Sequence, residues 1–221
     1  FRVDHQPAPG ETVLCPGYLA SPGGKGANQA AAAARAGAKT TMVGCVGADG
    51  FAALAVDTMR NSGVETNAVA TVDAPTACAA ISVDKDCENS IVVASGANLS
   101  TRAAQVPDAL LGPDTLLLLQ MEVDLAENWA LLERARERGA RTALNVAPAA
   151  PVPASALERL DYLIVNEIEG AAIAAATGID KHTPEDIPGQ LAERFGLTCV
   201  LTLGKAGAVL HGPSGGYAIP A

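Results

Sequence analysis

The stretch Ser21-Pro22-Gly23-Gly24-Lys25-Gly26-Ala27-Asn28-Gln29 leads directly into a run of alanines, Ala30 to Ala34. Glycine allows positive φ and the close approach of another molecule, and alanine favours helix, so the pattern predicts a glycine loop that opens a helix. The free N–H groups at such a helix start can bind anionic or oxygen-rich groups, and Lys25 adds a positive charge. The alternative is a tight turn before a helix of small residues, with Lys25 in solvent, and the local pattern favours neither.

Two standard nucleotide-binding motifs are excluded at this loop. A Walker loop needs Ser or Thr after its lysine, whereas Gly26 follows Lys25. A dinucleotide fingerprint needs a strand leading into the loop and a further glycine three residues on, and the sequence provides neither. The loop therefore indicates a polyhydroxylated or phosphorylated ligand without belonging to either motif.

Composition and charge limit the class of protein. The 221 residues suffice for one large α/β domain or two small ones, and with 49% hydrophobic but 3% aromatic residues the core must consist of Ala, Val, Leu and Ile. A net charge of −9 argues against non-specific binding to nucleic acid or to an anionic membrane. No run approaches the ~20 apolar residues of a membrane span, and no signal-peptide pattern is present.

Cysteines and histidines indicate neither a disulfide framework nor a metal centre. The five cysteines are scattered without a C-x-x-C pair, and His5, His182 and His211 are far apart in the sequence. Cys45 and Cys199 lie in apolar runs and are predicted to be small core residues. A reducing, cytoplasmic location is expected.

Apolar strands that alternate with helical segments predict an α/β fold: a mostly parallel sheet with helices on both faces, plus a small β-lid. Short extended pieces within residues 10–22 predict a hairpin-like flap before the glycine loop, which is the candidate lid. Expected strands cover residues 42–46, 69–72, 78–83, 90–94, 115–120, 142–145, 162–165 and 199–203, with the third and fourth paired as a hairpin. Expected helices follow the glycine loop and cover residues 50–62, 100–111, 124–138, 154–160, 167 onward and 184–195.

Polar residues follow four of the predicted parallel strands. Ligands of such sheets bind beyond the carboxyl ends of the strands. Any one of these residues is more simply explained as a helix cap, but four strands that end in this way favour a ligand site. The polar ends are Gln120 with Glu122, Asn145, Asn166 with Glu167 and Glu169, and Thr202 with Gly204, Lys205 and Gly207.

These motifs, in this order and spacing, resemble the ribokinase/PfkB family of carbohydrate kinases. The matching stretches are Pro9 to Val13, Gly23 to Ala30, Met121-Glu122, Asn145 to Ala149, Asn166 to Glu169 and Thr202 to Gly204. The resemblance covers essentially the whole chain and implies one ribokinase-like domain over residues 1–221, with the lid at about 10–22. Gly10-Glu11-Thr12 and the glycine loop look more like the ribokinase branch than like fructokinases or adenosine kinases.

The resemblance implies that ATP phosphorylates D-ribose at its terminal hydroxyl, giving D-ribose 5-phosphate, with Mg²⁺ as cofactor. In the family the glycine loop serves mainly the sugar, and the lid also forms a homodimer contact. The sugar-binding residues implied are Gly23, Gly24, Lys25, Asn28 and Glu122. The nucleotide-binding residues implied are Asn166, Thr202, Gly204 and Gly207, while Glu169 would organise Mg²⁺ through water, since this hard cation prefers oxygen ligands.

Two segments of the family pattern have no counterpart in the sequence. A first strand that ends in a sugar-binding Asp is expected before Phe1. A Gly-Ala-Gly-Asp motif, which supplies the anion hole and the catalytic base, is expected after Ala221, near a loop for a monovalent cation such as K⁺. No catalytic residue is therefore assigned here, and we expect this chain to be a fragment that is poorly soluble or inactive. The alternatives are a non-catalytic remnant that binds sugar or nucleotide, and a family kinase for another sugar or a nucleoside.

Overall fold

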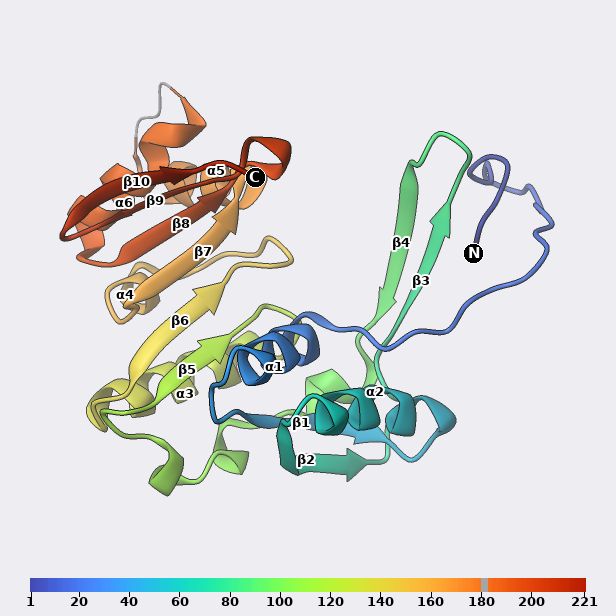
Figure 1. Ribbon diagram of the computed structural model, residues 1–221, viewed down its shortest axis with the longest axis horizontal. Helices are drawn as coiled ribbons and strands as arrows, with labels where there is room; N and C mark the ends of the chain where they lie inside the picture. Colours follow the sequence, from blue (N-terminus) through green and yellow to red (C-terminus); the bar gives the residue numbers. More distant parts are fainter. Residues whose placement is uncertain (180–182) are drawn as a thin grey trace. The chain divides into compact units, whose positions relative to one another are not determined.

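The computed structural model describes residues 1–179 and 183–221, which form two compact units, Phe1–Thr101 and Arg102–Ala221. Figure 1 shows the helices and strands of both. His182, one of the three histidines that are far apart in the sequence, lies outside the described residues.

The first unit contains two helices on a short parallel sheet. In chain order these are α1 (Lys25–Arg35), β1 (Thr41–Gly47), α2 (Gly50–Asn61) and β2 (Glu65–Val72), and β1 pairs with β2 in parallel. The predicted glycine loop and alanine helix are confirmed, because α1 begins directly after Gly24. The alanine side chains let α1 approach closely a small core that comprises Ala30, Val56, Met59 and Val64.

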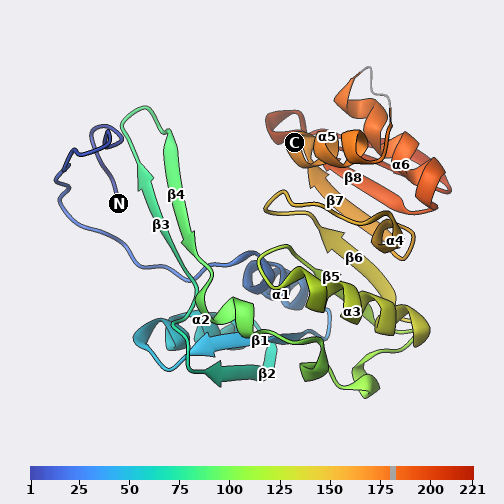
Figure 2. The same ribbon diagram turned by 180° about the vertical axis from the view of Figure 1, so that it is seen from behind.

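The first unit also carries an antiparallel hairpin, predicted correctly, of β3 (Cys78–Val83) and β4 (Asn89–Ala94). The flap predicted before the glycine loop is wrong in its secondary structure, since residues 10–22, all of them described, contain no strand. The N-terminal segment instead runs beside β3, where the Val3 N–H donates to the Val83 carbonyl over 3.0 Å. Within residues 10–22 the two prolines supply no N–H for strand pairing. Figures 1 and 2 show the hairpin as the strand-bearing projection of this unit.

The second unit is organised around a six-stranded sheet with the order β10-β9-β8-β7-β6-β5. Strands β5 to β8 are parallel, and β9 and β10 are antiparallel additions at one edge. The predicted mostly parallel α/β fold is confirmed, whereas the β9–β10 hairpin was missed. The strands are β5 (Leu116–Leu119), β6 (Arg141–Asn145), β7 (Tyr162–Asn166), β8 (Thr198–Thr202), β9 (Ala208–Gly212) and β10 (Gly215–Ile219).

Helices of the second unit share one face of its sheet, as Figure 2 shows. Each strand lies beside its predecessor, and right-handed crossovers in a constant direction place successive helices on the same side. The helices are α3 (Leu125–Glu137), α4 (Ala154–Leu157), α5 (Glu167–Ala176) and α6 (Ile187–Phe195).

Beneath these helices, neighbouring strands contribute the fully buried row Leu144, Leu163 and Cys199. Burial raises the pKa of Cys199 to about 12, so its side chain stays a neutral thiol and an inert part of the core. Cys45 is also buried, and the prediction that both cysteines are core residues is confirmed.

The helix predicted over residues 100–111 is wrong. That segment forms the short 3₁₀ turns η1 (Gly96–Ser100), η2 (Ala103–Gln105) and η3 (Asp108–Leu110). Pro107 interrupts the segment because it lacks an N–H, and Arg134 of α3 stabilises the irregular path by donating to the Ala103 carbonyl over 3.1 Å and to the Val106 carbonyl. Two other 3₁₀ turns, η4 (Pro184–Asp186) and η5 (Gly204–Ala206), precede α6 and follow β8.

Candidate functional site

The carboxyl ends of β7 and β8 bring two predicted nucleotide-binding residues side by side. Asn166 is the last residue of β7 and pairs in register with Thr202, the last residue of β8. Both side chains are exposed, although the preceding Val165 and Leu201 are buried. The strands are therefore held by their apolar residues and present their polar ends to solvent at one edge of the sheet.

Asn166 and Glu169 form a reciprocal cap at the start of α5. The Asn166 Oδ1 accepts from the Glu169 N–H over 2.9 Å, and the Glu169 Oε2 accepts from the Asn166 N–H over 2.8 Å. Glu169 is only 7% exposed. The simpler interpretation of this motif, a helix cap, is thus confirmed, and the cap also holds a carboxylate at the edge where β7 and β8 end.

A glycine turn follows β8 at the same edge. The Leu203 N–H donates to the Gly207 carbonyl over 2.8 Å and closes the turn around η5. Gly204 and Gly207 have φ values of 54° and 94°, a region that side chains other than glycine rarely adopt. A Cβ on Gly207 would lie 2.0 Å from the Ile219 carbonyl oxygen, so close packing against the end of β10 also requires glycine there.

Four of the predicted sugar-binding residues lie at the start of α1. Gly24 has a φ of 95° and has no side-chain cap over the helix start, and a Cβ on it would meet nothing within 4 Å. Asn28 is exposed, since Ala27 and Ala30 turn toward the core of the first unit. A helix start without a side-chain cap and an outward amide can together donate to and accept from hydroxyl groups.

Glu122, the fifth predicted sugar residue, belongs to the second unit. It is partly buried and lies between β5 and α3. Asn128, which was not predicted as a buried polar residue, is 5% exposed and donates from Nδ2 to the Gln120 carbonyl over 2.6 Å. Its spacing from Leu132 and Ala135, both buried, was the available signal, because it places a polar residue on the buried face of α3.

The side chains at the carboxyl ends of β7 and β8 can be compared with the ligands that Mg²⁺, the metal implied by the family resemblance, prefers. Within residues 1–179 and 183–221 no group of three or more His, Cys, Asp and Glu side chains could hold a metal ion. A single fixed carboxylate such as Glu169 does not suit zinc, but it suits Mg²⁺, which takes one or two carboxylates and completes its shell with water and phosphate oxygens.

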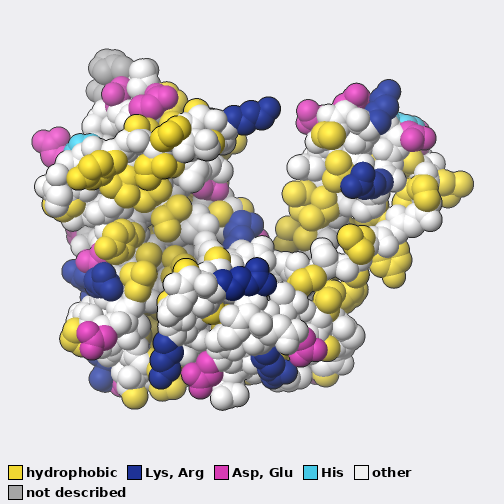
Figure 3. All heavy atoms as spheres, in the orientation of Figure 1, with side chains coloured by type: hydrophobic (Ala, Val, Ile, Leu, Met, Phe, Trp, Pro, Cys, Tyr) yellow, Lys and Arg dark blue, Asp and Glu magenta, His cyan; other side chains and the backbone are white. Residues whose placement is uncertain are grey.

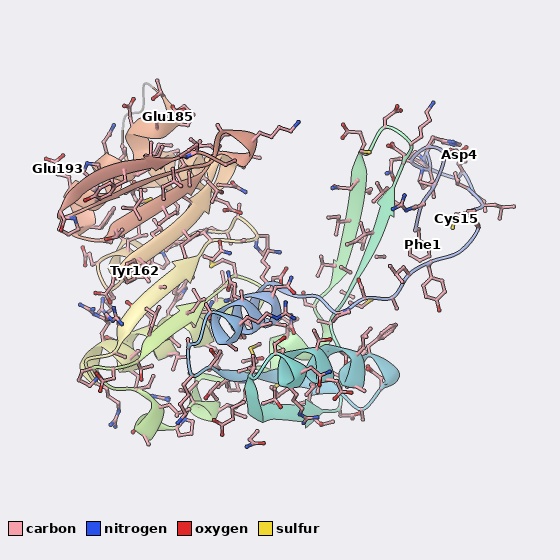
Figure 4. The ribbon with its side chains drawn as sticks, viewed as in Figure 1. Phe1, Asp4, Cys15, Tyr162, Glu185 and Glu193 are labelled. Atoms are coloured by element: carbon pink, nitrogen blue, oxygen red, sulfur yellow. The ribbon has the colours of Figure 1, made fainter. Side chains whose placement is uncertain are left out.

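Two shallow hollows on the surface are lined by other residues. One lies between the N-terminal segment and the hairpin and includes Phe1 and Val92, and the other lies beside α6 and includes Glu185, Glu193 and His211. Figure 4 shows Glu185 and Glu193 at the end of the second unit that bears α6, and Phe1 in the N-terminal segment. Neither hollow includes a predicted site residue. In the described part of the chain, no helix is long and apolar enough to cross a bilayer.

Comparison with known proteins assigns the family. Residues 2–221 match the model of the pfkB family carbohydrate kinases. The chain belongs to this family. By family it is a sugar kinase, and the resemblance seen in the sequence motifs is confirmed.

Individual relatives agree with this membership. Ribokinase of Haemophilus influenzae is 34% identical over 210 residues, which cover 94% of this chain and 69% of the relative. The crystal structure of ribokinase from Thermotoga maritima matches with a TM-score of 0.88 at 29% identity, covering 100% of this chain and 73% of that one. The structure of Arabidopsis thaliana ribokinase complexed with ribose and ATP matches with a TM-score of 0.84 at 27% identity, covering 99% of this chain and 73% of that one.

Proposed function

We propose that the protein, when full length, transfers the γ-phosphoryl group of ATP to the terminal hydroxyl of D-ribose. The observation that carries the proposal is the cluster at the carboxyl edge of the second unit, where Asn166, Glu169, Thr202 and the turn at Gly204–Gly207 lie together. Parallel α/β sheets bind ligands at that edge. The similarity to a ribokinase complexed with ribose and ATP supports the same two ligands here.

The nucleotide side of the site consists of backbone and short polar groups. The turn after β8 exposes Gly204 and Lys205, and Thr202 and Asn166 add a hydroxyl and an amide on adjacent strands. Glu169 would help to hold Mg²⁺ through water, and the bound ion would neutralise phosphate charge. The reciprocal cap keeps the Glu169 carboxylate in place before any ligand binds.

The proposed sugar-binding residues are those at the start of α1 in the first unit and Glu122 in the second unit. Because Gly23 and Gly24 carry no side chain, a sugar can approach the N–H groups of the helix start closely. Lys25 and Asn28 would donate to sugar hydroxyls, and Glu122 would accept from one. Such a site rejects a sugar that lacks one of these hydroxyls, since its own polar groups would lose their partners.

Ribose-dependent release of ADP from Mg²⁺-ATP tests the proposal. From the full-length protein we expect turnover with D-ribose, and at least about tenfold lower kcat/KM with 2-deoxyribose, because one lost hydroxyl leaves polar groups of the site unpaired. Calorimetric titration with ribose and with ATP, each measured separately, accompanies the assay. Binding of both ligands without ADP release would favour the non-catalytic binding protein. Turnover with fructose or adenosine but not with ribose would overturn the choice of sugar.

Matched variants locate the two ligands. Asn28→Ala is expected to raise KM for ribose at least about tenfold and to leave KM for ATP nearly unchanged, because the lost amide contacts hydroxyl groups of the sugar. Thr202→Val is expected to raise KM for ATP and to leave KM for ribose nearly unchanged. Equal effects of both variants on both ligands would contradict the assignment of the two sides.

A further inference from the structure

Asp49 joins the end of β1 to the segment that leads into the hairpin. Its Oδ2 accepts from the Thr76 N–H over 2.7 Å, while its Oδ1 caps α2 by accepting from the N–H groups of Phe51 and Ala52. The Thr76 Oγ1 in turn accepts from the Gly47 N–H over 2.9 Å. The N–H and the hydroxyl of Thr76 hold the pKa of Asp49 below its usual range.

The segment that follows β4 is hydrogen-bonded to the segment that precedes β3, next to Thr76. The Ala97 N–H donates to the Pro75 carbonyl over 2.7 Å, and Ala97 is fully buried. Added Cβ atoms would lie 2.3 Å from the Ala74 oxygen at Gly47 and 2.2 Å from the Pro75 oxygen at Gly96. The backbone at the end of β1 therefore packs directly against the segments before β3 and after β4, and neither glycine has room for a side chain. We call this junction, formed by Gly47, Asp49, Thr76, Gly96 and Ala97, the root of the hairpin.

Beyond this root the hairpin has few partners. All six residues of β4 are exposed. Hydrogen bonds that leave the described residues 78–94 go to the N-terminal segment, including one from the Phe1 amine to the Ile81 carbonyl over 2.8 Å. Figure 1 shows the hairpin projecting from the layer of β1 and β2. The hydrogen bonds of Asp49, Thr76 and Ala97 therefore join the hairpin to the layer of β1 and β2.

The root lies at the end of the first unit where α1 begins. Five residues, 36–40, connect α1 to β1, and the two elements pack together, so α1 runs antiparallel to β1. The start of α1, with Gly24 and Asn28, is consequently at the same end as Gly47 and Asp49.

We propose that Asp49 and Thr76 form a clamp that positions the β3–β4 hairpin as a cover for the sugar loop at the start of α1. Both are positioning residues that need not touch the sugar. The effect on substrate rests on the proposed function, whereas the clamp itself is a property of the first unit.

Hydrogen–deuterium exchange on the full chain tests the clamp without any substrate. Thr76→Val keeps the volume and the N–H but removes the hydroxyl that Gly47 and Asp49 contact. We expect amides in residues 74–77, 96–98 and the hairpin to exchange about fivefold faster, as for the loss of one buried hydrogen bond. Thr76→Ser should restore the parent rates. Thr58→Val, which removes a hydroxyl bonded to the Leu54 carbonyl within α2, is the matched control and should leave the hairpin unchanged.

Kinetics then separate positioning from folding. Thr76→Val should raise KM for ribose severalfold with little change in KM for ATP, and Thr58→Val should do neither. Unchanged hairpin exchange in Thr76→Val would overturn the clamp. Faster exchange with an unchanged KM for ribose would overturn the link to the sugar loop. If the full-length parent protein neither binds nor phosphorylates ribose, the proposed function fails, while the exchange data still decide the clamp.

Discussion

At the scale of single residues, Glu169 has two roles that substitution can separate. Glutamine keeps an oxygen that can accept from the Asn166 N–H, so Glu169→Gln should preserve the cap while removing the charge. We expect its melting temperature to stay near that of the parent and its affinity for ATP to fall at least about tenfold when Mg²⁺ is present. Calorimetric titration with and without Mg²⁺ measures this difference.

The comparison with Glu169→Ala completes that test. Alanine removes both the charge and the cap, and we expect it to lower the free energy of unfolding by about 1 kcal/mol in addition to its effect on ATP. If Glu169→Gln binds Mg²⁺-ATP as tightly as the parent, the carboxylate serves the helix alone.

Asp49 makes the stability of the first unit depend on pH. Its pKa is lowered in the folded state, chiefly by the Thr76 N–H, and the pKa of Glu11 is lowered by the Ala8 N–H and by His5. A lowered folded pKa contributes stability that is present above the unfolded value, about 4, and is lost as pH falls through the folded value. We therefore expect thermal melting between pH 6 and about pH 3 to fall less steeply for Asp49→Asn than for the parent. Parallel curves would contradict this assignment.

At the scale of elements, the turn between β3 and β4 contains a correctable strain. Cys87 has a φ of 64°, and the turn is closed by the Cys87 N–H, which donates to the Asp84 carbonyl over 3.1 Å. Side chains disfavour this region, so Cys87→Gly should raise the free energy of unfolding by up to about 1 kcal/mol, a rise of about 2–4 °C in melting temperature. Cys87→Ala is the control, since alanine removes the thiol and keeps the strain. Equal melting of the two variants would count against the strain.

The elements predicted correctly share a feature: their signal is local. Alanines after a glycine loop predicted α1, Asp49 before an apolar period predicted α2, and the polar turn at Asp84-Lys85-Asp86 predicted the β3–β4 hairpin. The hairpin β9–β10, which was missed, is short. Its first strand is stabilised by pairing with β8, and a contact of this kind cannot be read from a local sequence pattern. The helix expected over residues 100–111 failed because Arg134, distant in sequence, stabilises another path.

The candidate site was predictable in part for the same reason. The rule that parallel strands present their carboxyl ends together correctly grouped Asn166 with Thr202. Contacts between segments distant in sequence were not predictable, and the bond between Asp49 and Thr76 is the example with the largest consequence. Asp49 was predicted as a cap for α2, but a second role for the same carboxylate leaves no trace in the spacing of residues.

At the scale of the whole molecule, the exposed hairpin bears on self-association. Resemblance implied a homodimer through a lid at about residues 10–22, a segment that contains no strand. The exposed strands of the first unit are instead those of the β3–β4 hairpin, where Ile91, Val92 and Val93 are 51%, 70% and 50% exposed. We expect light scattering to give a dimer, and Val92→Lys to weaken it at least about tenfold, because a charge would be buried at the interface. Lys85→Glu, a change of charge in the exposed turn, is the control. A monomeric parent would contradict the dimer.

The sheet of the second unit is unequal on its two faces. The helices cover one face, and the other carries the row Ile164, Val200, Leu210 and Tyr217 on neighbouring strands. Figure 3 shows hydrophobic side chains gathered over β7 to β10 on this face, where Tyr217 is 64% exposed. Parallel sheets normally bury both faces, whereas this face of the described second unit carries apolar side chains that its own helices leave open.

The consecutive strand order from β5 to β10 has a consequence for synthesis on the ribosome. Each strand that leaves the exit tunnel finds its only required neighbour, the preceding strand, already made. The sheet can therefore grow in the direction of translation, and no strand has to be inserted later between two that are already paired. Because closing short loops costs less entropy than closing long ones, every step of this growth is a local one. A nascent chain long enough for β7 to have left the tunnel would hold β5, β6 and β7 in their final register, with one edge of β7 still unpaired until β8 emerges.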